Sequence, residues 1–264
     1  MNRIDKAFAE LKAKSDKALI CFITGGDPDF ETTKDLALKI FGSGADIVEI
    51  GIPFSDPLAD GPTIQSASFR ALQAGASVKG IFDNVRSIRT HCDKPIVLMT
   101  YYNPVQKYGL VKFADDAASA GADGVIMVDL PVEEASDWKS AADSASLATI
   151  FLLAPTSTKE RIALTANMAS GFIYCVSRTG VTGAQSSVPT DLKALVDTIK
   201  SASGLPVVIG FGISKPEHVK QVTEFADGAV VGSALVSIVD KSASSTEATE
   251  RAGVFVRELK KGTS

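Results

Sequence analysis

The sequence predicts an α/β fold, a (β/α)8 or TIM barrel, and three observations support this prediction. Short apolar runs rich in Val, Ile and Leu recur along the whole chain of 264 residues. These runs are continuous rather than alternating, as in parallel strands that are buried on both faces. The segments between them are rich in Ala, Lys and Glu and repeat apolar residues at helical spacing. No linker divides the series, so we expect a single barrel domain over residues 1–264, with an open doubly wound sheet as the alternative.

The chain opens with a helical segment that precedes the first apolar run. Ile4, Phe8 and Leu11 share one face of this segment. A helix outside the eight repeats has to cover an apolar surface of its own. We therefore expect an extra N-terminal helix that plugs the bottom of the barrel.

Eight apolar runs are expected to form the strands. They are residues 18–24, 46–51, 95–100, 123–128, 148–153, 171–176, 206–210 and 227–232. Helical spacing between them is clear in three places. These places are Leu36, Ile40 and Phe41; Val78, Ile81, Phe82, Val85 and Ile88; and Leu192, Leu195, Val196 and Ile199.

A weak internal repeat marks the turns that lead into three of the strands. The sequences are SGAD at 43–46, AGAD at 120–123 and ADGA at 226–229. In each, a helix ends, the chain turns at or near Gly, and Asp comes just before or at the start of an apolar run. We interpret these residues as structural signals at the bottom of the barrel, and we expect catalysis at the opposite rim.

Composition excludes several classes of function. The chain has 27 Lys and Arg against 31 Asp and Glu, a net charge of −4, which argues against nucleic acid or an anionic membrane as the main partner. Three separated Cys and two His predict neither a disulfide framework nor a metal site. No apolar run approaches the ~20 residues that cross a bilayer, and acidic residues precede the first one, unlike a signal peptide. We expect a soluble cytoplasmic protein.

Two carboxylates near the end of the second strand are the candidate catalytic residues. Glu49 lies inside an apolar run, where an ionised carboxylate is costly, so its pKa should rise or a partner must be found. A pKa near neutrality suits a group that both donates and accepts protons. Asp60 precedes Gly61 and Pro62, so it could act in the site, cap the following helix, or both. For Glu49 the alternative is a structural carboxylate satisfied by a local Lys or by backbone donors.

Glycine-rich segments follow the last three strands. They are SRTGVTG at 177–183, GFGIS at 210–214 and GSA at 232–234. Backbone N–H groups without an obstructing Cβ, and the start of a helix at Ser233, suit a phosphate group, although glycine often only turns the chain. Barrels commonly build phosphate sites from the loops after strands seven and eight. The nucleotide-binding pattern GxxxxGK[ST] is absent from the sequence.

Apolar side chains near the strand ends could form a slot for a flat ring, or simply be barrel core. They are Phe22, Met99, Ile126, Leu152, Tyr174 and Phe211.

The sequence resembles the tryptophan synthase α subunit family over about residues 15–235. The resemblance is carried by EIGIPFSDP at 49–57 with ADGP at 59–62, and by the shorter motifs TYYNP at 100–104, DLP at 129–131, SRTGVTG at 177–183 and GFGI at 210–213. It implies a lyase that cleaves indole-3-glycerol phosphate to indole and glyceraldehyde 3-phosphate by a retro-aldol reaction, without a metal or organic cofactor.

The resemblance also implies the roles of individual residues. Glu49 would transfer the protons and Asp60 would hold the indole N–H, while Thr182 and Arg178 would belong to a loop that closes over the site. The implied phosphate ligands are Gly183, Gly212, Gly232 and Ser233. The implied indole pocket is Phe22, Ile64, Met99, Ile126, Tyr174 and Phe211.

The same resemblance implies a partner, the tryptophan synthase β subunit, which carries pyridoxal phosphate and receives indole in an α2β2 heterotetramer. Apolar and proline-rich rim loops suit such an interface. The expected interface residues are Pro53, Asp56, Pro57, Asn103, Pro104 and Pro131.

Three other functions share some of these features. A barrel isomerase or synthase of another sugar phosphate would share the phosphate loops, but it would not explain Glu49 and Asp60 beside an aromatic slot. A subunit that only regulates a partner would have no need of the two carboxylates. A lyase that releases indole without a β subunit would have the same motifs, so dependence on a partner stays open.

Overall fold

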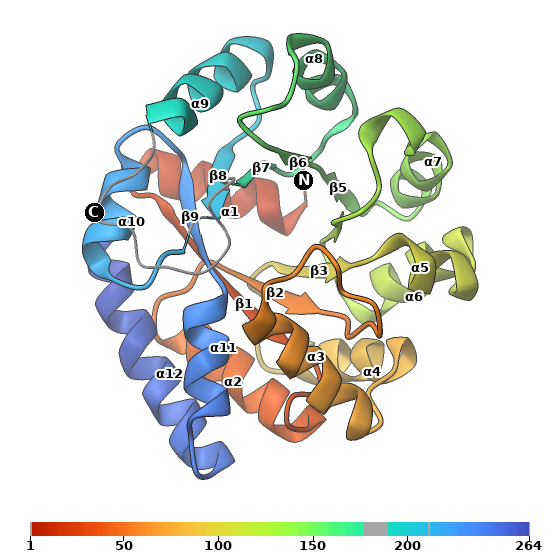
Figure 1. Cartoon of the computed structure of the whole chain (residues 1–264), viewed down its shortest axis with the longest axis vertical. Helices are drawn as coiled ribbons and strands as arrows, with labels where there is room; N and C mark the ends of the chain where they lie inside the picture. The colour runs from red at the N-terminus through yellow and green to blue at the C-terminus, as the bar shows by residue number, and fades with distance from the viewer. Residues whose placement is uncertain (1, 177–189, 211, 264) are drawn as a thin grey trace.

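The computed structural model describes residues 2–176, 190–210 and 212–263, which form a barrel of parallel strands surrounded by helices (Figure 1). The strands are β1 (Ala18–Thr24), β2 (Ile47–Gly51), β3 (Ile96–Thr100), β4 (Gly124–Met127), β5 (Ala148–Ile150), β6 (Leu152–Leu153), β7 (Ile173–Val176), β8 (Val207–Gly210) and β9 (Gly228–Val231). The order in the sheet is β5-β4-β3-β2-β1-β9-β8-β7-β6. Its two ends, β5 and β6, are one predicted strand interrupted at Phe151, so this single segment closes the barrel. The predicted (β/α)8 barrel is confirmed.

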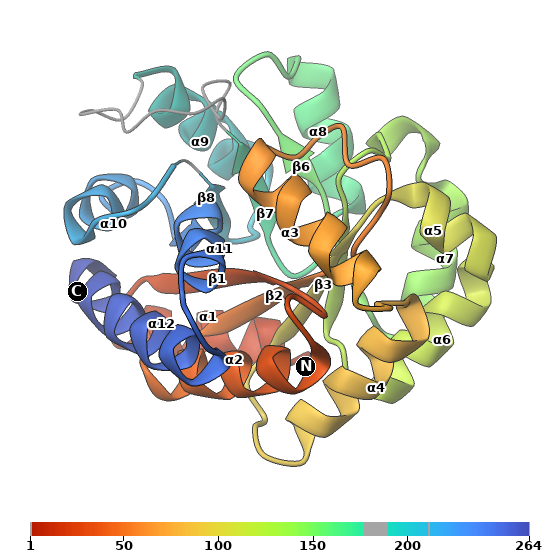
Figure 2. The same cartoon turned by 60° about the horizontal axis from the view of Figure 1, so that its bottom comes forward.

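Helices cover the outside of the strands, as Figure 2 shows from a second direction. They are α1 (Arg3–Ala13), α2 (Phe30–Gly42), α3 (Pro62–Gln73), α4 (Val78–Arg89), α5 (Tyr102–Tyr108), α6 (Leu110–Ala120), α7 (Ser136–Ser144), α8 (Lys159–Met168), α9 (Thr190–Ala202), α10 (Pro216–Thr223), α11 (Ser233–Asp240) and α12 (Ser245–Lys260), with short 3-10 turns η1 (Val132–Glu134) and η2 (Lys261–Thr263). Side-chain caps fix several starts: Asp29 accepts from the N–H of Thr32 in α2, and Ser244 from that of Glu247 in α12.

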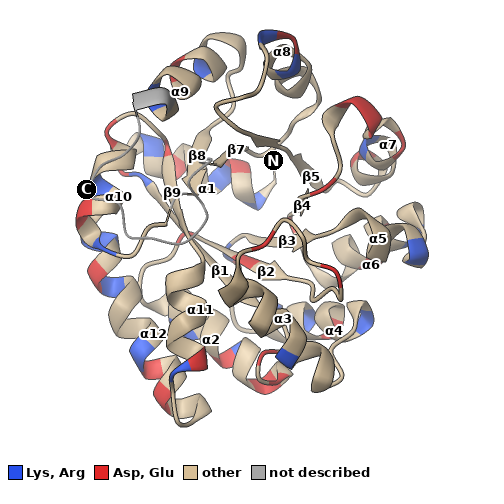
Figure 3. Cartoon of the chain, in the orientation of Figure 1, with Lys and Arg blue, Asp and Glu red and all other residues tan. Residues whose placement is uncertain are grey.

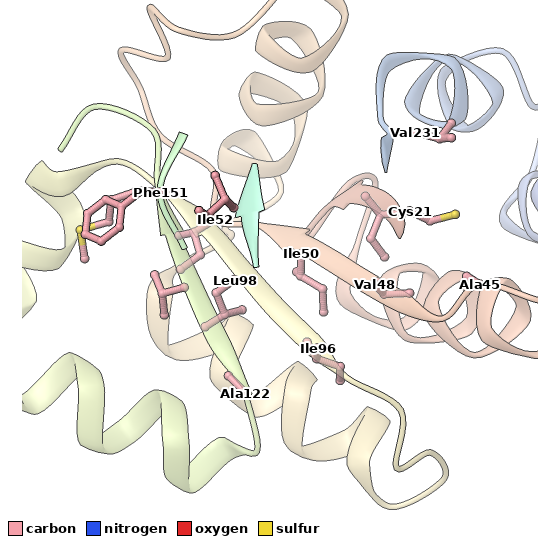
Figure 4. Packing of buried hydrophobic residues seen from close by; sticks show 14 of the residues in the cluster. Cys21, Ala45, Val48, Ile50, Ile52, Ile96, Leu98, Ala122, Phe151 and Val231 are labelled. Atoms are coloured by element: carbon pink, nitrogen blue, oxygen red, sulfur yellow. The ribbon is translucent and has the colours of Figure 1, made fainter. Parts of the chain in front are cut away.

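Each strand is buried on both faces, which explains its continuous apolar sequence. Side chains that point outward, such as Val48 and Ile50, pack against the surrounding helices (Figure 4). Alternate side chains, such as Ile20, Ile47 and Val97, fill the interior of the barrel. Position along a strand therefore decides whether a residue supports the helices or approaches the site.

The N-terminal helix closes one end of the barrel, as predicted. Ile4 and Phe8 of α1 are buried in the interior cluster, and Leu11 packs against it. The rings of Phe8 and Phe172 lie 5.8 Å apart between centroids. In Figure 1, α1 lies behind the strands, on the side away from α3.

The three repeated aspartates have one shared structural role at this end. Each accepts a hydrogen bond from a backbone N–H at the start of a neighbouring strand: Asp46 from Leu19 at 2.8 Å, Asp123 from Ile96 at 2.8 Å, and Asp227 from Val207 at 3.0 Å. Each is also paired with a cation, namely Lys260, Arg89 and Lys200 respectively. These aspartates align adjacent strands, which supports their interpretation as structural residues.

Charged residues of both signs are interspersed over the surrounding helices in Figure 3. Within the described ranges, none of the helices is long and apolar enough to span a membrane.

Candidate functional site

Glu49 is buried in the barrel, and its carboxyl has no hydrogen-bond partner among the residues that the structure describes. The residue is 1% exposed, and neither carboxylate oxygen is paired with any group in the described part of the chain. Burial raises the pKa of Glu49 from 4.5 to about 8, because the interior disfavours the charged form. A local Lys or backbone donor does not satisfy this carboxyl among the described residues, so the structural alternative for Glu49 is not supported.

The register of β2 explains why Glu49 faces the interior. Ile47 belongs to the interior cluster, and Glu49 follows it by two residues on the same face. Glu49 lies beside Phe22 of β1 and Val97 of β3. The carboxyl is therefore one layer closer than Ile47 to the rim where the strands end.

Asp60 lies in the loop between β2 and α3, and it is not the cap of α3. The N-cap is Gly61, and no side chain in the described part of the chain caps this helix. Instead the Tyr101 hydroxyl donates to Asp60 Oδ2 at 3.0 Å and accepts from the Ala59 N–H at 3.0 Å. Capping therefore does not explain Asp60, and the contact to Tyr101 fixes its loop over the end of β3.

The surroundings of Asp60 and Tyr101 raise the pKa of both groups. Burial raises the pKa of Asp60, and the hydrogen bond from Tyr101 opposes that rise. Burial and the nearby carboxylate raise the pKa of Tyr101. The hydroxyl therefore stays protonated and remains a donor to Asp60.

A small pocket lined mainly by apolar side chains lies at the rim beside Asp60, and Glu49 is not part of its lining. Its lining residues come from β1, the β2 end and its loop, α3, the β3 end and the residue after β4; they are Phe22, Gly51, Ile52, Asp60, Ile64, Ser68, Met99, Thr100, Tyr101 and Val128. Of the predicted indole residues, Phe22, Ile64 and Met99 line this pocket. Ile126 lies a layer deeper, fully buried in the barrel interior, and Val128 occupies the corresponding place at the rim.

Gly51 is required by the position of the Phe22 ring. A Cβ on Gly51 would lie 2.6 Å from Cζ of Phe22, closer than carbon atoms can approach. The ring therefore lies across the end of β2, two residues from Glu49 in sequence. Period-two alternation from Glu49 could have identified Gly51 as the next residue on the same face of β2.

Tyr174 lies in the interior near both carboxylates. It is 8% exposed, and its pKa is raised by burial and by the charges of Glu49 and Asp60. The adjacent strand leaves room for it, because a Cβ on Gly210 would lie 2.3 Å from the Tyr174 hydroxyl. The predicted residues Glu49, Asp60 and Tyr174 are thus electrostatically coupled in one region of the barrel.

Two of the predicted phosphate residues lie beside this pocket. A Cβ on Gly232 would come 3.7 Å from Phe22 and 4.0 Å from Ile64, and Ser233 is the first residue of α11. Gly212 is exposed after β8, with a φ of +38°. Gly183, Arg178, Thr182 and Phe211 lie outside the described residues.

The expected interface residues differ in exposure. Asp56, Asn103 and Pro131 are exposed, Pro57 and Pro104 are half-buried, and Pro53 is buried within the chain. Leu58, which ends the expected interface segment 53–58, is 89% exposed on the same rim loop.

Neither a metal site nor the cavity at the opposite end of the barrel offers an alternative location in the described structure. No group of three or more His, Cys, Asp or Glu that could hold a metal occurs among the described residues. A cavity of about 700 Å³ lies at the opposite end of the barrel, between α1 and the loop before β8, and it contains neither Glu49 nor Asp60. The buried carboxyl of Glu49, together with Asp60 and the pocket beside it, therefore identifies the end of the barrel where the strands end as the candidate active site.

Comparisons with known proteins agree with this geometry. The family model described as "Tryptophan synthase alpha chain" matches residues 8–264. A tryptophan synthase alpha chain of Geobacter sp. (strain M21) is 52% identical over 262 residues, 99% of this chain and 98% of that protein. One from Thermoanaerobacter sp. (strain X514) is 48% identical over 260 residues, 98% of this chain and 99% of that protein.

Solved structures show the same similarity. The tryptophan synthase subunit alpha of Legionella pneumophila str. Paris superposes with a TM-score of 0.92 at 39% identity, covering 100% of this chain and 98% of that chain. A chain of tryptophan synthase from M. tuberculosis, in an aminoacrylate-bound form, superposes with a TM-score of 0.89 at 35% identity, covering 100% of both chains.

Proposed function

Because the chain belongs to the tryptophan synthase alpha chain family, whose members are lyases that cleave indole-3-glycerol phosphate to indole and glyceraldehyde 3-phosphate, we propose that Glu49 and Asp60 carry out this reaction. The observation that supports the proposal best is the buried carboxyl of Glu49, which has no partner within the described ranges and a pKa of about 8, at the same end of the barrel as Asp60.

Glu49 acts first as an acid and then as a base. In its neutral form it donates a proton to C3 of the indole ring, which places positive charge on the ring nitrogen. The resulting carboxylate then takes the proton of the side-chain hydroxyl next to C3. The C–C bond breaks, its electron pair returns to the ring, and an aldehyde forms. Glu49 ends protonated, as it began, and general acid–base help of this kind contributes about 10²–10⁴-fold in rate.

Asp60 holds the indole N–H and stabilises the cation that forms on the ring. Its carboxylate is positioned in advance by Tyr101, so little reorganisation is needed as charge develops. The ring lies between Phe22, Ile64 and Met99, which line the pocket next to Asp60. Tyr174 and Ile126 complete the apolar surroundings below the ring. Phe211, which lies outside the described residues, is also proposed as an indole-pocket residue.

The phosphate binds at the adjoining rim. Gly232 and Ser233 present the start of α11, where backbone N–H groups favour an anion, and Gly212 and Gly183 add further backbone donors. For Thr182 and Arg178, which lie outside the described residues, we propose the role that the family resemblance implies, closure over the substrate. This arrangement spans the ring and the phosphate of a single ligand, because Gly232 lies next to Phe22 and Ile64.

The family name implies a beta chain as partner. We propose an α2β2 heterotetramer in which the beta chain, with its pyridoxal phosphate, receives indole, while this chain itself uses no cofactor. The proposed contact surface is the rim loop with Leu58, Asp56, Pro57 and Pro53, together with Asn103, Pro104 and Pro131. The free thiols of Cys21, Cys92 and Cys175 fit a reducing compartment, the cytoplasm.

The decisive experiment measures indole release from indole-3-glycerol phosphate by the wild type and by Glu49→Gln. We expect turnover to fall by at least about 10²-fold, with substrate binding retained. Glu224→Gln, which neutralises an exposed acid at the C-cap of α10, is the matched control and should keep full activity. Near-normal turnover by Glu49→Gln would reject the catalytic assignment. Turnover of phosphoribosylanthranilate by the wild type, instead of indole-3-glycerol phosphate, would favour the isomerase alternative.

A further inference from the structure

Arg70 joins three segments that surround the site. Arg70 itself does not line the pocket. It lies on α3, and its guanidinium makes two hydrogen bonds to Asp27, from Nε at 2.9 Å and from Nη2 at 2.8 Å. Its Nη1 lies 2.6 Å from Oδ1 of Asp240. Asp27 belongs to the loop after β1, and Asp240 is the last residue of α11.

The two helices joined in this way hold opposite ends of the substrate in the proposed reaction. α3 carries Ile64 and Ser68 of the apolar pocket and follows Asp60 directly. α11 begins at Ser233, on the phosphate side. Ala67 of α3 and Val236 of α11 meet in a small apolar cluster with Phe22 of β1, and Ile64 and Met99 pack against this cluster.

The ion pairs of Arg70 differ from ordinary surface pairs. The Asp27 side chain is 3% exposed, and both of its oxygens are held by the same planar guanidinium, a geometry that fixes direction as well as distance. Asp27 is attached to the barrel, since its N–H donates to the Thr24 carbonyl and the Gly25 N–H donates to the Gly51 carbonyl. The guanidinium therefore positions α3 relative to the strand ends and to α11 at once.

We propose that Arg70 is a positioning residue that fixes the separation between the indole side and the phosphate side of the site. This inference rests on the proposed function. A ligand that reaches both sides benefits from a fixed separation, because the binding of one end places the other end at its site. Ligands that occupy only one side gain nothing from it. The test is therefore a comparison of one joined ligand with its two parts.

The experiment measures the binding of three probes to the full chain by calorimetry: indole, inorganic phosphate, and indole-3-propanol phosphate, which joins a ring and a phosphate but cannot be cleaved. For Arg70→Lys, which cannot form the two-pronged contact to Asp27, we expect the joined probe to bind about tenfold more weakly. Indole and phosphate should change by less than about twofold. For indole-3-glycerol phosphate we expect kcat to fall by about ten- to a hundredfold, since small displacements remote from the chemistry have effects of this size.

Two further variants keep the test decisive if Arg70→Lys does not fold. Asp240→Asn removes only the link to α11 at a half-exposed side chain, and we expect the same selective loss at a smaller size. Arg86→Gln, on α4, is the control, because Arg86 pairs only with Asp83 of its own helix in the described structure; it should bind all three probes as the wild type does.

Equal loss for all three probes, or no loss for any, would overturn the inference and leave Arg70 as a stabilising residue only. Failure of the wild type to bind the joined probe or to release indole would instead count against the proposed function, so the two failures are distinguishable.

Discussion

Replacing Glu49 by Gln should make the free energy of unfolding depend differently on pH. In the unfolded chain this carboxyl loses its proton above about pH 4.5, whereas in the folded protein its pKa is about 8. Between these values the folded state binds one more proton than the unfolded state. The stability associated with Glu49 is therefore fully present below pH 4.5 and is lost progressively as pH rises to about 8. Gln does not titrate, so the variant lacks this loss.

The magnitude follows from the size of the pKa shift. Each pH unit inside this window costs the wild type about 1.4 kcal/mol relative to the variant. Because Glu49 is 1% exposed, solvent does not screen this effect appreciably. Between pH 5.5 and pH 7.5 the stability of Glu49→Gln minus that of the wild type should rise by about 2–3 kcal/mol.

Urea unfolding at pH 5.5, 6.5 and 7.5 measures this difference, since every other titrating group is common to both proteins and cancels. Glu224→Gln, at an exposed position, is the control and should differ from the wild type by the same amount at all three values. A difference for Glu49→Gln that is constant with pH would refute the claim that this carboxyl is buried and neutral at pH 7.

Three further predictions concern other parts of the structure. Gly51→Ala places a Cβ 2.6 Å from Phe22, so we expect a loss of about 1–3 kcal/mol in urea unfolding together with slower indole release; unchanged values for both would contradict the geometry. Tyr101→Phe removes the hydrogen bond to Asp60, which should lower kcat/KM by about ten- to a hundredfold. Because that bond lowers the pKa of Asp60, the loss should grow as pH falls, and a loss independent of pH would argue against it. Phe8→Ala should cost about 3–5 kcal/mol of stability with kcat unchanged, since α1 lies at the end opposite the site; a reduced kcat in the folded variant would show that the two ends are coupled.

Much of the fold could be predicted because its signals are local. Continuous apolar runs such as 18–24 can be buried on both faces only if helices cover them, which leads to the barrel and its strand positions. The aspartates at 46, 123 and 227 recur at the same point of the repeat, and their shared role follows from that. The break at Phe151 has no such signal, since residues 148–153 form one apolar run.

Parts of the candidate site required contacts between segments far apart in sequence. Glu49 was identifiable because a charge inside an apolar strand is anomalous by itself. Tyr101 was not, because its hydroxyl reaches Asp60 across 41 residues, and the motif around Asp60 suggested a helix cap just as well. Ile126 was predicted at the pocket in place of Val128, because sequence indicates which face a side chain takes but not the level at which the pocket begins.

The helix α1, which closes one end of the barrel, precedes β1 in the sequence, whereas residues that it packs against lie far along the chain. Ile4 and Phe8 rest on Ala148 and Phe172, and the N–H of Lys17 donates to the carbonyl of Thr263 at the far terminus. The apolar face of α1 therefore stays uncovered until the segments that carry Ala148 and Phe172 have been made and folded. Closing this end of the barrel depends on contacts between segments far apart in sequence, which form slowly and leave apolar surface exposed in the meantime.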